Sequence, residues 1–401
     1  MKQFDVLVAG GGPVGWACAL ACARALGSKN SAPRVAIVDR EQGGVVGPVS
    51  VDAPLSRRVY AVSQRSIAQL GGWNVSLDRS RTATIEQIVV HTAACATPAL
   101  TLGAADRRTE AIGAVIEHEA LTARIAQAAQ AQGVLRIPGE CIGADCTGES
   151  RTVELADSSL LRAKLLVVAD GRESALASSL EIAFTERSYE RRGVVAHFQI
   201  DTPHRGDARQ WFLPDDTILA LLPLPDVNGA PAVSMVWSVS ESRGAELLAM
   251  SAEALCEAVS AATDGSVQMS AVLQSAVAFP LALKRMPDPV ADRVIVVGDA
   301  AHAVHPLAGQ GVNLGFGDAQ TLHDVMAAGH KQQIDLGSAL LTGKYRRQRY
   351  APTLGLALTT DLLARLYNLG QWPTLKPFAD TGMQVLGRLP AFRRLLSSAA
   401  A

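Results

Sequence analysis

The sequence of 401 residues has no apolar run long enough to cross a membrane as a helix. Although 48% of its residues are hydrophobic, charged residues interrupt every apolar stretch before the roughly 20 residues that a spanning helix requires. The N-terminus begins directly in a predicted strand, without the basic region, apolar stretch and small-residue cleavage site of a secretory signal. We therefore expect a cytoplasmic protein.

An excess of charge of one sign and closely spaced cysteine pairs are also absent. Lys plus Arg number 37 and Asp plus Glu 38, which gives no overall drive toward nucleic acid. The six cysteines form no CxxC pair, so we expect buried, reduced thiols and no metal site. HExxH, Ser-His-Asp and paired-carboxylate motifs are missing too. The sequence thus favours chemistry that is carried by a bound cofactor.

Three glycines near the N-terminus form a G-x-G-x-x-G pattern. They follow an apolar strand, Val6 to Ala9, and open an Ala-rich helix. In this context the first glycine makes a tight turn, the second admits a pyrophosphate, and the third lets helix and strand pack closely. A second apolar strand, Val35 to Val38, ends in Asp39, which is suited to binding ribose hydroxyls, although it could also cap a turn. These features predict a dinucleotide site.

Two further apolar strands end in Asp and Gly. Val294 to Val297 runs into Gly298-Asp299 and a glycine-punctuated loop that opens a helix, and Leu165 to Ala169 stops at Asp170-Gly171. A helix N-terminus aimed at the pyrimidine edge of a flavin would stabilise its reduced, negatively charged form. An ordinary strand-turn-helix and a simple turn are the alternatives. We favour one extended cofactor that meets all these strand ends.

The motifs, in this order, resemble the group A flavoprotein monooxygenases, one-component aromatic hydroxylases with the p-hydroxybenzoate hydroxylase fold. HPLAGQGVN (305–313) and RVYAVSQRSIAQLGGW (58–73) are similar to the ubiquinone-biosynthesis branch of this family. The resemblance implies an α/β fold in which a Rossmann-like FAD-binding domain carries an inserted antiparallel β-sheet substrate domain and a C-terminal helical segment.

The resemblance also implies which residues contact FAD. Its adenosine half would be held by the glycine turn and the end of the second strand, the ribityl chain by Asp299, and the isoalloxazine ring by the loop that follows. Asp170 and Gly171 would support the flavin and the approach of the nicotinamide, and Arg58 would meet the cofactor phosphates or the passing reductant. The full set is Gly10, Gly12, Pro13, Val14, Gly15, Asp39, Arg40, Arg58, Asp170, Gly171, Gly298, Asp299, Pro306, Gly309, Gln310, Gly311, Val312 and Asn313.

Two positions depart from the family pattern. Relatives often carry Asp-x-Arg where this chain has Ser56-Arg57-Arg58, so the acid is missing and either arginine could be the contact. Relatives also often show Val-Glu-Asn where this chain has Ile116-Glu117-His118, which leaves the role of His118 open.

The pattern of elements predicts a discontinuous organisation. We expect an FAD-binding domain in residues 1–82, 103–180 and 287–350, a substrate-binding sheet in 83–102 and 181–286, and C-terminal helices in 351–401. Arg209, Trp211 and Trp237 fall in the predicted substrate sheet. They could line a pocket, but tryptophans in a sheet equally often pack in a core.

The resemblance implies an enzyme that uses FAD, NAD(P)H and O₂ to hydroxylate the aromatic ring of a polyprenyl phenol or quinol precursor of ubiquinone. The alternatives are a hydroxylase of small soluble aromatic compounds and a catalytically silent FAD-binding assembly subunit. No catalytic residue is assigned. His302 and His305 flank the flavin loop and could accept a proton from a phenol, although capping a helix and orienting the loop are the simpler roles.

Leucines recur at helical spacing near the C-terminus, at Leu354, Leu358, Leu362 and Leu366, and a further helix is expected near 378–396. These helices could pack on the cofactor domain or on a partner chain in a homo-oligomer. Because polyprenylated phenols partition into bilayers, peripheral contact with a membrane or with a ubiquinone-biosynthesis complex is the alternative.

Overall fold

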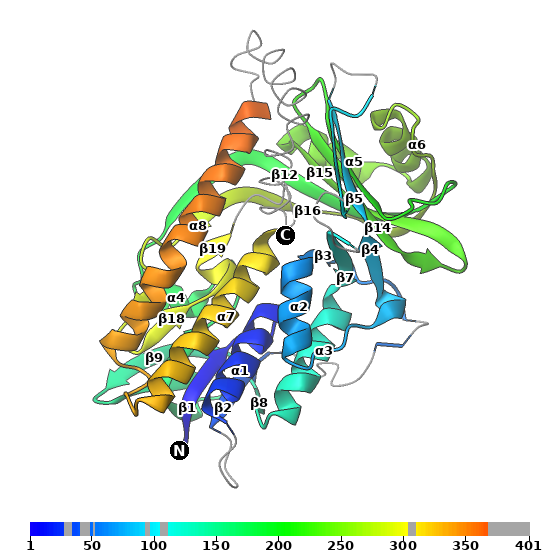
Figure 1. Ribbon diagram of the computed structural model, residues 1–401. Helices are drawn as coiled ribbons and strands as arrows, with labels where there is room; N and C mark the ends of the chain where they lie inside the picture. The colour runs from blue at the N-terminus through cyan, green and yellow to red at the C-terminus, as the bar shows by residue number, and fades with distance from the viewer. Residues whose placement is uncertain are drawn as a thin grey trace.

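The computed structural model describes residues 1–27, 34–40, 49–50, 53–92, 97–104, 111–303 and 310–367. Two large sheets dominate it, with the N-terminal strands in the lower one and the green strands in the upper one (Figure 1). A three-stranded sheet packs on the upper one. This arrangement confirms the expected α/β fold with an inserted antiparallel sheet.

The lower sheet is mostly parallel, in the order β17-β18-β11-β1-β2-β8. Its strands are β1 (Lys2–Ala9), β2 (Val35–Asp39), β8 (Leu135–Pro138), β11 (Leu160–Val168), β17 (Val290–Ala291) and β18 (Val294–Val296). The hairpin of β9 (Cys141–Thr147) and β10 (Ser150–Leu155) extends from β11.

Both faces of this lower sheet are covered, which explains why its strands are almost continuously apolar. Val6 and Val8 point to one face, where α1 (Pro13–Leu26), α3 (His118–Ala131) and α7 (Gln310–Lys331) pack. Leu7 and Ala9 point to the other face, which is covered by α4 (Ala175–Ser179) and the β9-β10 hairpin. The core of the nucleotide-binding layer therefore lies on both sides of β1.

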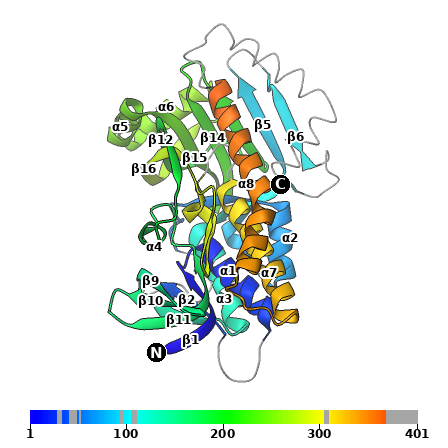
Figure 2. The same cartoon turned by 90° about the vertical axis from the view of Figure 1, so that its left-hand side faces the viewer.

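The upper sheet has the order β19-β16-β12-β15-β14-β13-β5-β6, with β6 at its edge (Figure 2). Only the pair β13-β5 is parallel among the described strands of this sheet. The strands are β5 (Gln87–Thr92), β6 (Leu100–Gly103), β12 (Thr185–Ile200), β13 (Asp207–Phe212), β14 (Ile218–Val227), β15 (Ala230–Ser240), β16 (Met269–Arg285) and β19 (His302–Ala303). Helices α5 (Glu241–Ala249) and α6 (Ala252–Ala262) cover one of its faces.

The opposite face of the upper sheet packs at one end on the small sheet of β3 (Val59–Ser63), β7 (Gly113–Glu117) and β4 (Thr82–Ile85). Helix α2 (Gln64–Gly72) follows β3, and the 3-10 turn η1 (Arg79–Arg81) precedes β4. Of the segment 83–102 that we expected in the substrate layer, β5 and β6 lie in the upper sheet, whereas β4 pairs with β7 of the small sheet.

Strands β12 and β16 are much longer than the others, with 16 and 17 residues. They pair with each other from Thr185↔Arg285 to Ile200↔Met269, and register shifts interrupt the ladder, for example between Ser188 and Arg191. One end of this ribbon lies beside the lower sheet and the other end lies within the upper sheet (Figure 1). The two strands therefore connect the two layers.

Helix α8 (Ala339–Tyr367) packs beside α7 and extends from the level of the lower sheet toward the upper one (Figures 1 and 2). It runs through the boundary that we expected between residues 350 and 351, with Pro352 inside it. Leu354, Leu358, Leu362 and Leu366 belong to this helix, whereas the helix expected near 378–396 lies outside the described residues. Among the described helices, none combines the length and apolar character needed to span a bilayer.

Candidate active site

Three strand ends of the lower sheet meet at one edge. The Gly10 N–H donates to the carbonyl of Val38 over 2.9 Å, and the Ala169 N–H donates to Ala9 over 2.7 Å. The Val297 N–H donates in turn to Val168 over 2.9 Å. The carboxyl ends of parallel strands form the usual ligand-binding edge of such a sheet. The structure thus brings together the glycine turn, Asp170-Gly171 and Gly298-Asp299, which are far apart in sequence.

The backbone of the glycine turn is packed too tightly for side chains at two of its positions. Gly10 has φ +109°, and a Cβ there would lie 2.4 Å from the carbonyl oxygen of Ala169. A Cβ on Gly15 would lie 1.9 Å from the carbonyl oxygen of Gly10. Both positions therefore require glycine, because helix α1 sits directly against the strand ends.

Gly12 has a different environment. It is the N-cap of α1, no side chain caps the helix, and Pro13 occupies the first turn. A Cβ on Gly12 would meet no atom within 4 Å. Open space therefore adjoins Gly12 at the N-terminus of α1, whose first N–H groups have no partner within the helix, and a helix N-terminus of this kind binds phosphate. This geometry fits the pyrophosphate of FAD.

Val14 connects this helix N-terminus to the second glycine-rich turn. A Cβ on Gly298 would lie 3.0 Å from Cγ1 of Val14, and a Cβ on Gly315 would lie 2.4 Å from its Cγ2. The Val14 side chain therefore packs between the turn of residues 298–300 and helix α7. Its role in the structure is to set the spacing between the two halves of the cofactor edge.

Asp39 lies at the end of β2, where it is only 8% exposed. A Cβ on Gly11 would lie 2.1 Å from Cγ of Asp39, so the Asp39 carboxylate sits directly beside the glycine turn. Its Oδ2 is 3.4 Å from Nη2 of Arg136 on β8. Arg40, by contrast, is largely exposed and pairs with Glu140 at 3.3 Å. The position of Asp39 fits a contact with the adenosine ribose.

Arg58 and Asp299 meet across the site, although 241 residues separate them. Nη2 of Arg58 lies 3.2 Å from Oδ2 of Asp299, and the Arg58 side chain is exposed whereas that of Asp299 is partly exposed. The guanidinium also lies 5.0 Å above the ring centroid of Tyr60, whose hydroxyl is 2.9 Å from Nδ1 of His118. Of the two arginines, Arg58 is therefore the one at the Gly298-Asp299 turn, which we call the flavin turn. His118 orders the tyrosine on which Arg58 stacks.

Where relatives often carry an acid two residues before Arg58, this chain has Ser56. Two acids of neighbouring elements, Glu117 and Glu119, contact this serine. The Ser56 N–H donates to Glu117 over 2.7 Å, and its hydroxyl contacts the carboxylate of Glu119. Glu117 is nearly fully buried and pairs with Arg81 at 3.1 Å. His197 of β12 contacts the Ser56 carbonyl through Nε2 over 2.7 Å. The segment that leads to Arg58 is thus fixed by β7, α3 and the upper sheet together.

Asp170 has a carboxylate oxygen in need of a partner. Its Oδ1 is buried and has no hydrogen-bond partner among the described residues. Burial raises the pKa of Asp170, and the hydrogen bond with Ser174 partly opposes this effect. Native proteins rarely leave such an atom unpaired, so a hydroxyl or N–H of a bound cofactor fits here. Gly171, with φ +95°, forms the adjoining turn.

Of the expected flavin loop, Pro306, Gly309 and His305 lie outside the described residues. Gln310 begins α7. A Cβ added to the next residue, Gly311, would lie 3.5 Å from Oδ1 of Asp299, so Gly311 lies beside this carboxylate. Val312 is buried in the core. Asn313 joins α7 to β3, because it accepts from the Ser63 N–H and donates to the Ala61 carbonyl, both over 2.9 Å.

A buried ionic cluster next to Gly298 was not predicted from the sequence. Asp318 of α7 accepts from the Gly298 N–H over 2.9 Å, from His302 Nε2 over 2.7 Å, and from Arg349 Nε of α8 over 2.6 Å. His302 therefore pairs with Asp318 and does not cap a helix. The available signal was an acid on an otherwise apolar helix face, one turn from Leu314 and from Leu322.

The protonation of Asp318 gives a testable dependence on pH. Burial alone would raise its pKa, but His302 and Arg349 outweigh this effect and lower the pKa to about 2. A carboxyl whose folded-state pKa is depressed stabilises the fold fully above its unfolded pKa, near 3.8, and this contribution is lost as pH falls through about 2. We expect the urea midpoint of the apoprotein to fall between pH 4 and pH 2, and to fall less in Asp318→Asn. Equal slopes for the two proteins in this range would contradict the assignment.

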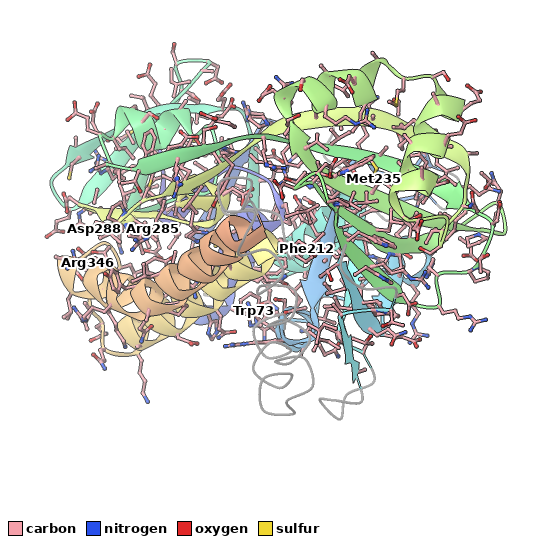
Figure 3. The ribbon with its side chains drawn as sticks, turned by 90° about the horizontal axis from the view of Figure 1, so that it is seen from above. Trp73, Phe212, Met235, Arg285, Asp288 and Arg346 are labelled. Atoms are coloured by element: carbon pink, nitrogen blue, oxygen red, sulfur yellow. The ribbon has the colours of Figure 1, made fainter. Side chains whose placement is uncertain are left out.

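The structure places two of the three residues expected to line a substrate pocket in the core of the upper sheet. Trp211 and Trp237 are 6% and 3% exposed and belong to the core between the upper sheet and helices α5 and α6. Nε1 of Trp237 donates to Thr217 over 3.1 Å, and Arg209 pairs with Asp207 at 2.9 Å. Figure 3 shows Met235, of this same core, and Phe212, nearer the middle of the molecule. The tryptophans therefore have the packing role, because they face the helices.

Comparison with known proteins identifies the family. The family model described as FAD binding domain matches residues 3–351. The chain belongs to this family. The expectation that FAD is its cofactor is confirmed. The flavoprotein resembles the mitochondrial ubiquinone biosynthesis monooxygenase COQ6 of Mus musculus, with 31% identity over 92% of this chain and 85% of that protein.

Two other relatives extend the comparison. Ubiquinone hydroxylase UbiL of Rhodospirillum rubrum is 28% identical over 92% of the flavoprotein and 82% of its own length. The flavoprotein spans 57% of the length of the COQ6 relative from Xenopus tropicalis, at 34% identity. Among solved structures, p-nitrophenol 4-monooxygenase PnpA of Pseudomonas putida DLL-E4 superposes with a TM-score of 0.74, at 18% identity, over 100% of the flavoprotein and 98% of PnpA. This last similarity supports the fold.

Proposed function

We propose that this flavoprotein uses NAD(P)H and O₂ to hydroxylate the aromatic ring of a polyprenyl phenol or quinol precursor of ubiquinone. The observation that carries the proposal is the similarity, over 92% of the chain, to one relative named as a ubiquinone biosynthesis monooxygenase and to another named as a ubiquinone hydroxylase. The cofactor edge supports an active enzyme over a silent subunit, because Gly12 leaves open space at the N-terminus of α1 and Asp39, Asp170 and Asp299 provide polar groups along the same edge.

The residues of this chain bind and orient FAD, which supplies the redox chemistry and the activation of O₂ when it is bound. In this proposal the N–H groups at Gly12 hold the pyrophosphate, Asp39 holds the adenosine ribose, and Asp299 holds the ribityl chain. Arg58 neutralises negative charge on the cofactor or on the arriving reductant. Asp170 presents its free carboxylate oxygen on the same edge.

We place the substrate on the face of the upper sheet that is opposite α5 and α6. A cross-strand row on this face, formed by Val195, Val236, Ala220 and Gln210, is only partly buried. The same face packs at its other end on the small sheet that carries β3, next to Arg58. An apolar row with a single amide suits an aromatic ring that bears a hydrocarbon tail.

Two serines flank this row on the same face and would recognise ring oxygens. Ser234 and Ser238 of β15 are 0% and 4% exposed. Neither hydroxyl has a hydrogen-bond partner within the part of the chain that the structure describes. A buried hydroxyl without a partner costs folding free energy, and a phenol or methoxy oxygen of the substrate would remove this cost.

Ser238→Ala tests this assignment. Because the buried hydroxyl makes no hydrogen bond in the described structure, its removal should not lower the free energy of unfolding of the apoprotein and should raise it by up to about 1–3 kcal/mol. The KM for a polyprenyl phenol should rise about 3- to 10-fold, as expected for one lost hydrogen bond. Steady-state kinetics and urea unfolding of the same preparation measure both quantities.

Ser260→Ala is the matched control, because the Ser260 hydroxyl is buried in α6 and accepts from the Met269 N–H over 2.9 Å. This variant should lose stability and keep its KM. An unchanged KM in both Ser238→Ala and Ser234→Ala would remove the serines from the substrate site.

The function itself is tested by substrate-stimulated NAD(P)H oxidation and by complementation of strains that are each blocked at one ring-hydroxylation step. We expect a polyprenyl phenol to stimulate oxidation and one strain to regain ubiquinone. Stimulation by small benzoates alone would favour the hydroxylase of soluble aromatics. Binding of FAD without O₂ consumption on any precursor would favour the assembly subunit. Contact with a membrane surface and homo-oligomerisation stay predictions, since residues 378–396 lie outside the described structure.

A further inference from the structure

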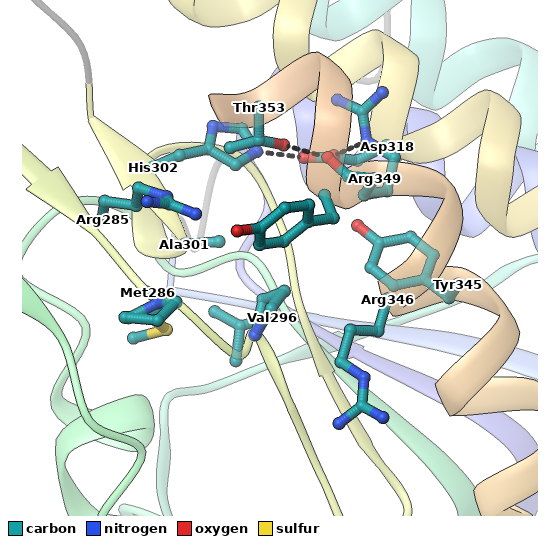
Figure 4. Close-up of a pocket in the computed structure, with 13 residues that line it drawn as sticks. Arg285, Met286, Val296, Ala301, His302, Asp318, Tyr345, Arg346, Arg349 and Thr353 are labelled. Carbon is teal, nitrogen blue, oxygen red and sulfur yellow. Dashed lines mark hydrogen bonds and ion pairs between the residues drawn. The ribbon is translucent and has the colours of Figure 1, made fainter. Parts of the chain in front are cut away.

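The ionic cluster around Asp318 is adjacent to the flavin turn but is not part of its surface. Asp318, His302 and Arg349 are only 1%, 4% and 7% exposed. Figure 4 shows His302 and Arg349 reaching Asp318 from opposite sides, above a small pocket that also includes Arg285 and Tyr345. None of the residues of the glycine turn at positions 10–15 lines this pocket.

Four elements meet at Asp318. Gly298 begins the 3-10 turn that carries Asp299, His302 begins β19 of the upper sheet, Asp318 belongs to α7, and Arg349 belongs to α8. Arg349 also donates through Nη2 to the carbonyl of Leu314 over 2.9 Å. A Cβ on Gly317 would lie 2.9 Å from its Nη1, so the guanidinium fills the space beside this glycine. The cluster thus connects both helices to the turn.

The hydrogen bond between Asp318 and Gly298 links the cluster to the turn that we expect to hold the cofactor. Oδ2 of Asp318 accepts from the backbone N–H of Gly298, and the next residue is Asp299. A hydrogen bond from a backbone amide to a buried carboxylate is strong and directional. It therefore fixes the orientation of the Val297–Gly298 peptide, which leads into Asp299.

We propose that Asp318 is a positioning residue for FAD, which holds the Gly298-Asp299 turn in place by accepting hydrogen bonds from Gly298, His302 and Arg349. Arg349 and His302 keep the carboxylate ionised and aimed at the Gly298 amide. Through Arg349, the position of α8 is coupled to the flavin turn. This inference rests on FAD as the cofactor and is independent of the proposed substrate.

Asp318→Asn is the direct test. An amide has one acceptor oxygen, so it cannot accept from both Gly298 and Arg349, and its own NH₂ opposes one of these donors. We expect the Kd of the apoprotein for FAD, measured by flavin fluorescence, to rise about 10- to 100-fold. Loss of a buried negative charge should also make the midpoint potential of the bound flavin more positive.

Asp335→Asn is the matched control. Asp335 also pairs with an arginine, since its Oδ2 lies 2.6 Å from Nη2 of Arg293. Within the described residues the hydrogen bonds of its carboxylate go to Arg293 and to the Gly337 N–H, not to the Gly298-Asp299 turn. This variant should lose some stability toward urea and keep both its Kd for FAD and its midpoint potential.

A purely structural role for Asp318 predicts a different result. Both variants would then lose stability toward urea, while the folded protein would bind FAD with unchanged Kd and potential, and this outcome would overturn the proposal. If Asp318→Asn does not fold, Arg349→Lys and His302→Asn take its place, since each keeps the carboxylate and removes one contact. Each is expected to raise the Kd for FAD about 3- to 10-fold, and an unchanged Kd in both would equally overturn the proposal.

Discussion

Gly15→Ala is expected to give a protein that neither folds stably nor binds FAD. The added Cβ would lie 1.9 Å from the carbonyl oxygen of Gly10 and 3.4 Å from Cβ of Ala169. Helix α1 would therefore have to move away from the ends of β1 and β11, which breaks the tight packing of the lower sheet. Overpacking of this kind costs about 1–3 kcal/mol or more. Urea unfolding of the apoprotein and flavin absorbance of the purified protein measure the two effects.

Gly12→Ala separates the fold from the cofactor. The new Cβ would meet no protein atom within 4 Å, and the backbone of Gly12 has the ordinary φ of −70°. We expect the apoprotein to unfold at nearly the same urea concentration as the original protein, while FAD binding weakens because the methyl group blocks the approach of the pyrophosphate. If Gly12→Ala binds FAD normally, the pyrophosphate does not lie at the N-terminus of α1.

Asp299→Ala is expected to weaken FAD binding about 10- to 100-fold, as for the loss of one or more hydrogen bonds to a charged group. The carboxylate is partly exposed, and its partner in the protein is the exposed Arg58. Exposed ion pairs contribute little to stability, so the free energy of unfolding of the apoprotein should change by less than about 1 kcal/mol. Titration of the apoprotein with FAD gives the Kd.

Asp288→Ala is the control for Asp299→Ala, because Asp288 also forms a largely exposed pair with an arginine, Arg346, at 2.8 Å. It lies outside the flavin turn and should keep its affinity for FAD. Full flavin occupancy in purified Asp299→Ala would mean that the ribityl chain is held by another group.

The sequence predicted the cofactor edge because its residues follow directly from local rules. A buried strand that ends in glycine or aspartate places that residue at the carboxyl edge of a parallel sheet, and hydrogen bonds then align β2, β1, β11 and β18. Gly10, Asp170 and Asp299 could therefore be brought to one edge without knowledge of any contact between them.

The face of the upper sheet was harder to predict. Both faces of β15 are largely buried, so alternation along the strand does not reveal which face meets α5 and α6 and which faces the flavin side. Trp237 and Ser238 are neighbours in sequence with opposite roles. The tryptophans could have lined a pocket but lie on the face that α5 and α6 cover. The serines lie on the opposite face, where we propose that the substrate binds.

The ionic cluster could not be predicted because its members come from three separate elements. Asp318 and Arg349 are 31 residues apart on two helices, and only the packing angle of α8 against α7 brings them within 2.6 Å. Sequence spacing specifies contacts within a helix. It does not specify which residues meet between helices.

The long ribbon of β12 and β16 determines how the molecule can be divided. To separate the lower sheet from the upper sheet, the chain would have to be cleaved within both β12 and β16. The cleaved strands would then expose unpaired backbone groups to other chains. Neither layer is therefore expected to survive as an excised fragment. Insertions or fusion partners are best placed at the tight β14-β15 hairpin, where Asn228 and Gly229 both have positive φ, and limited proteolysis should release no stable half of the molecule.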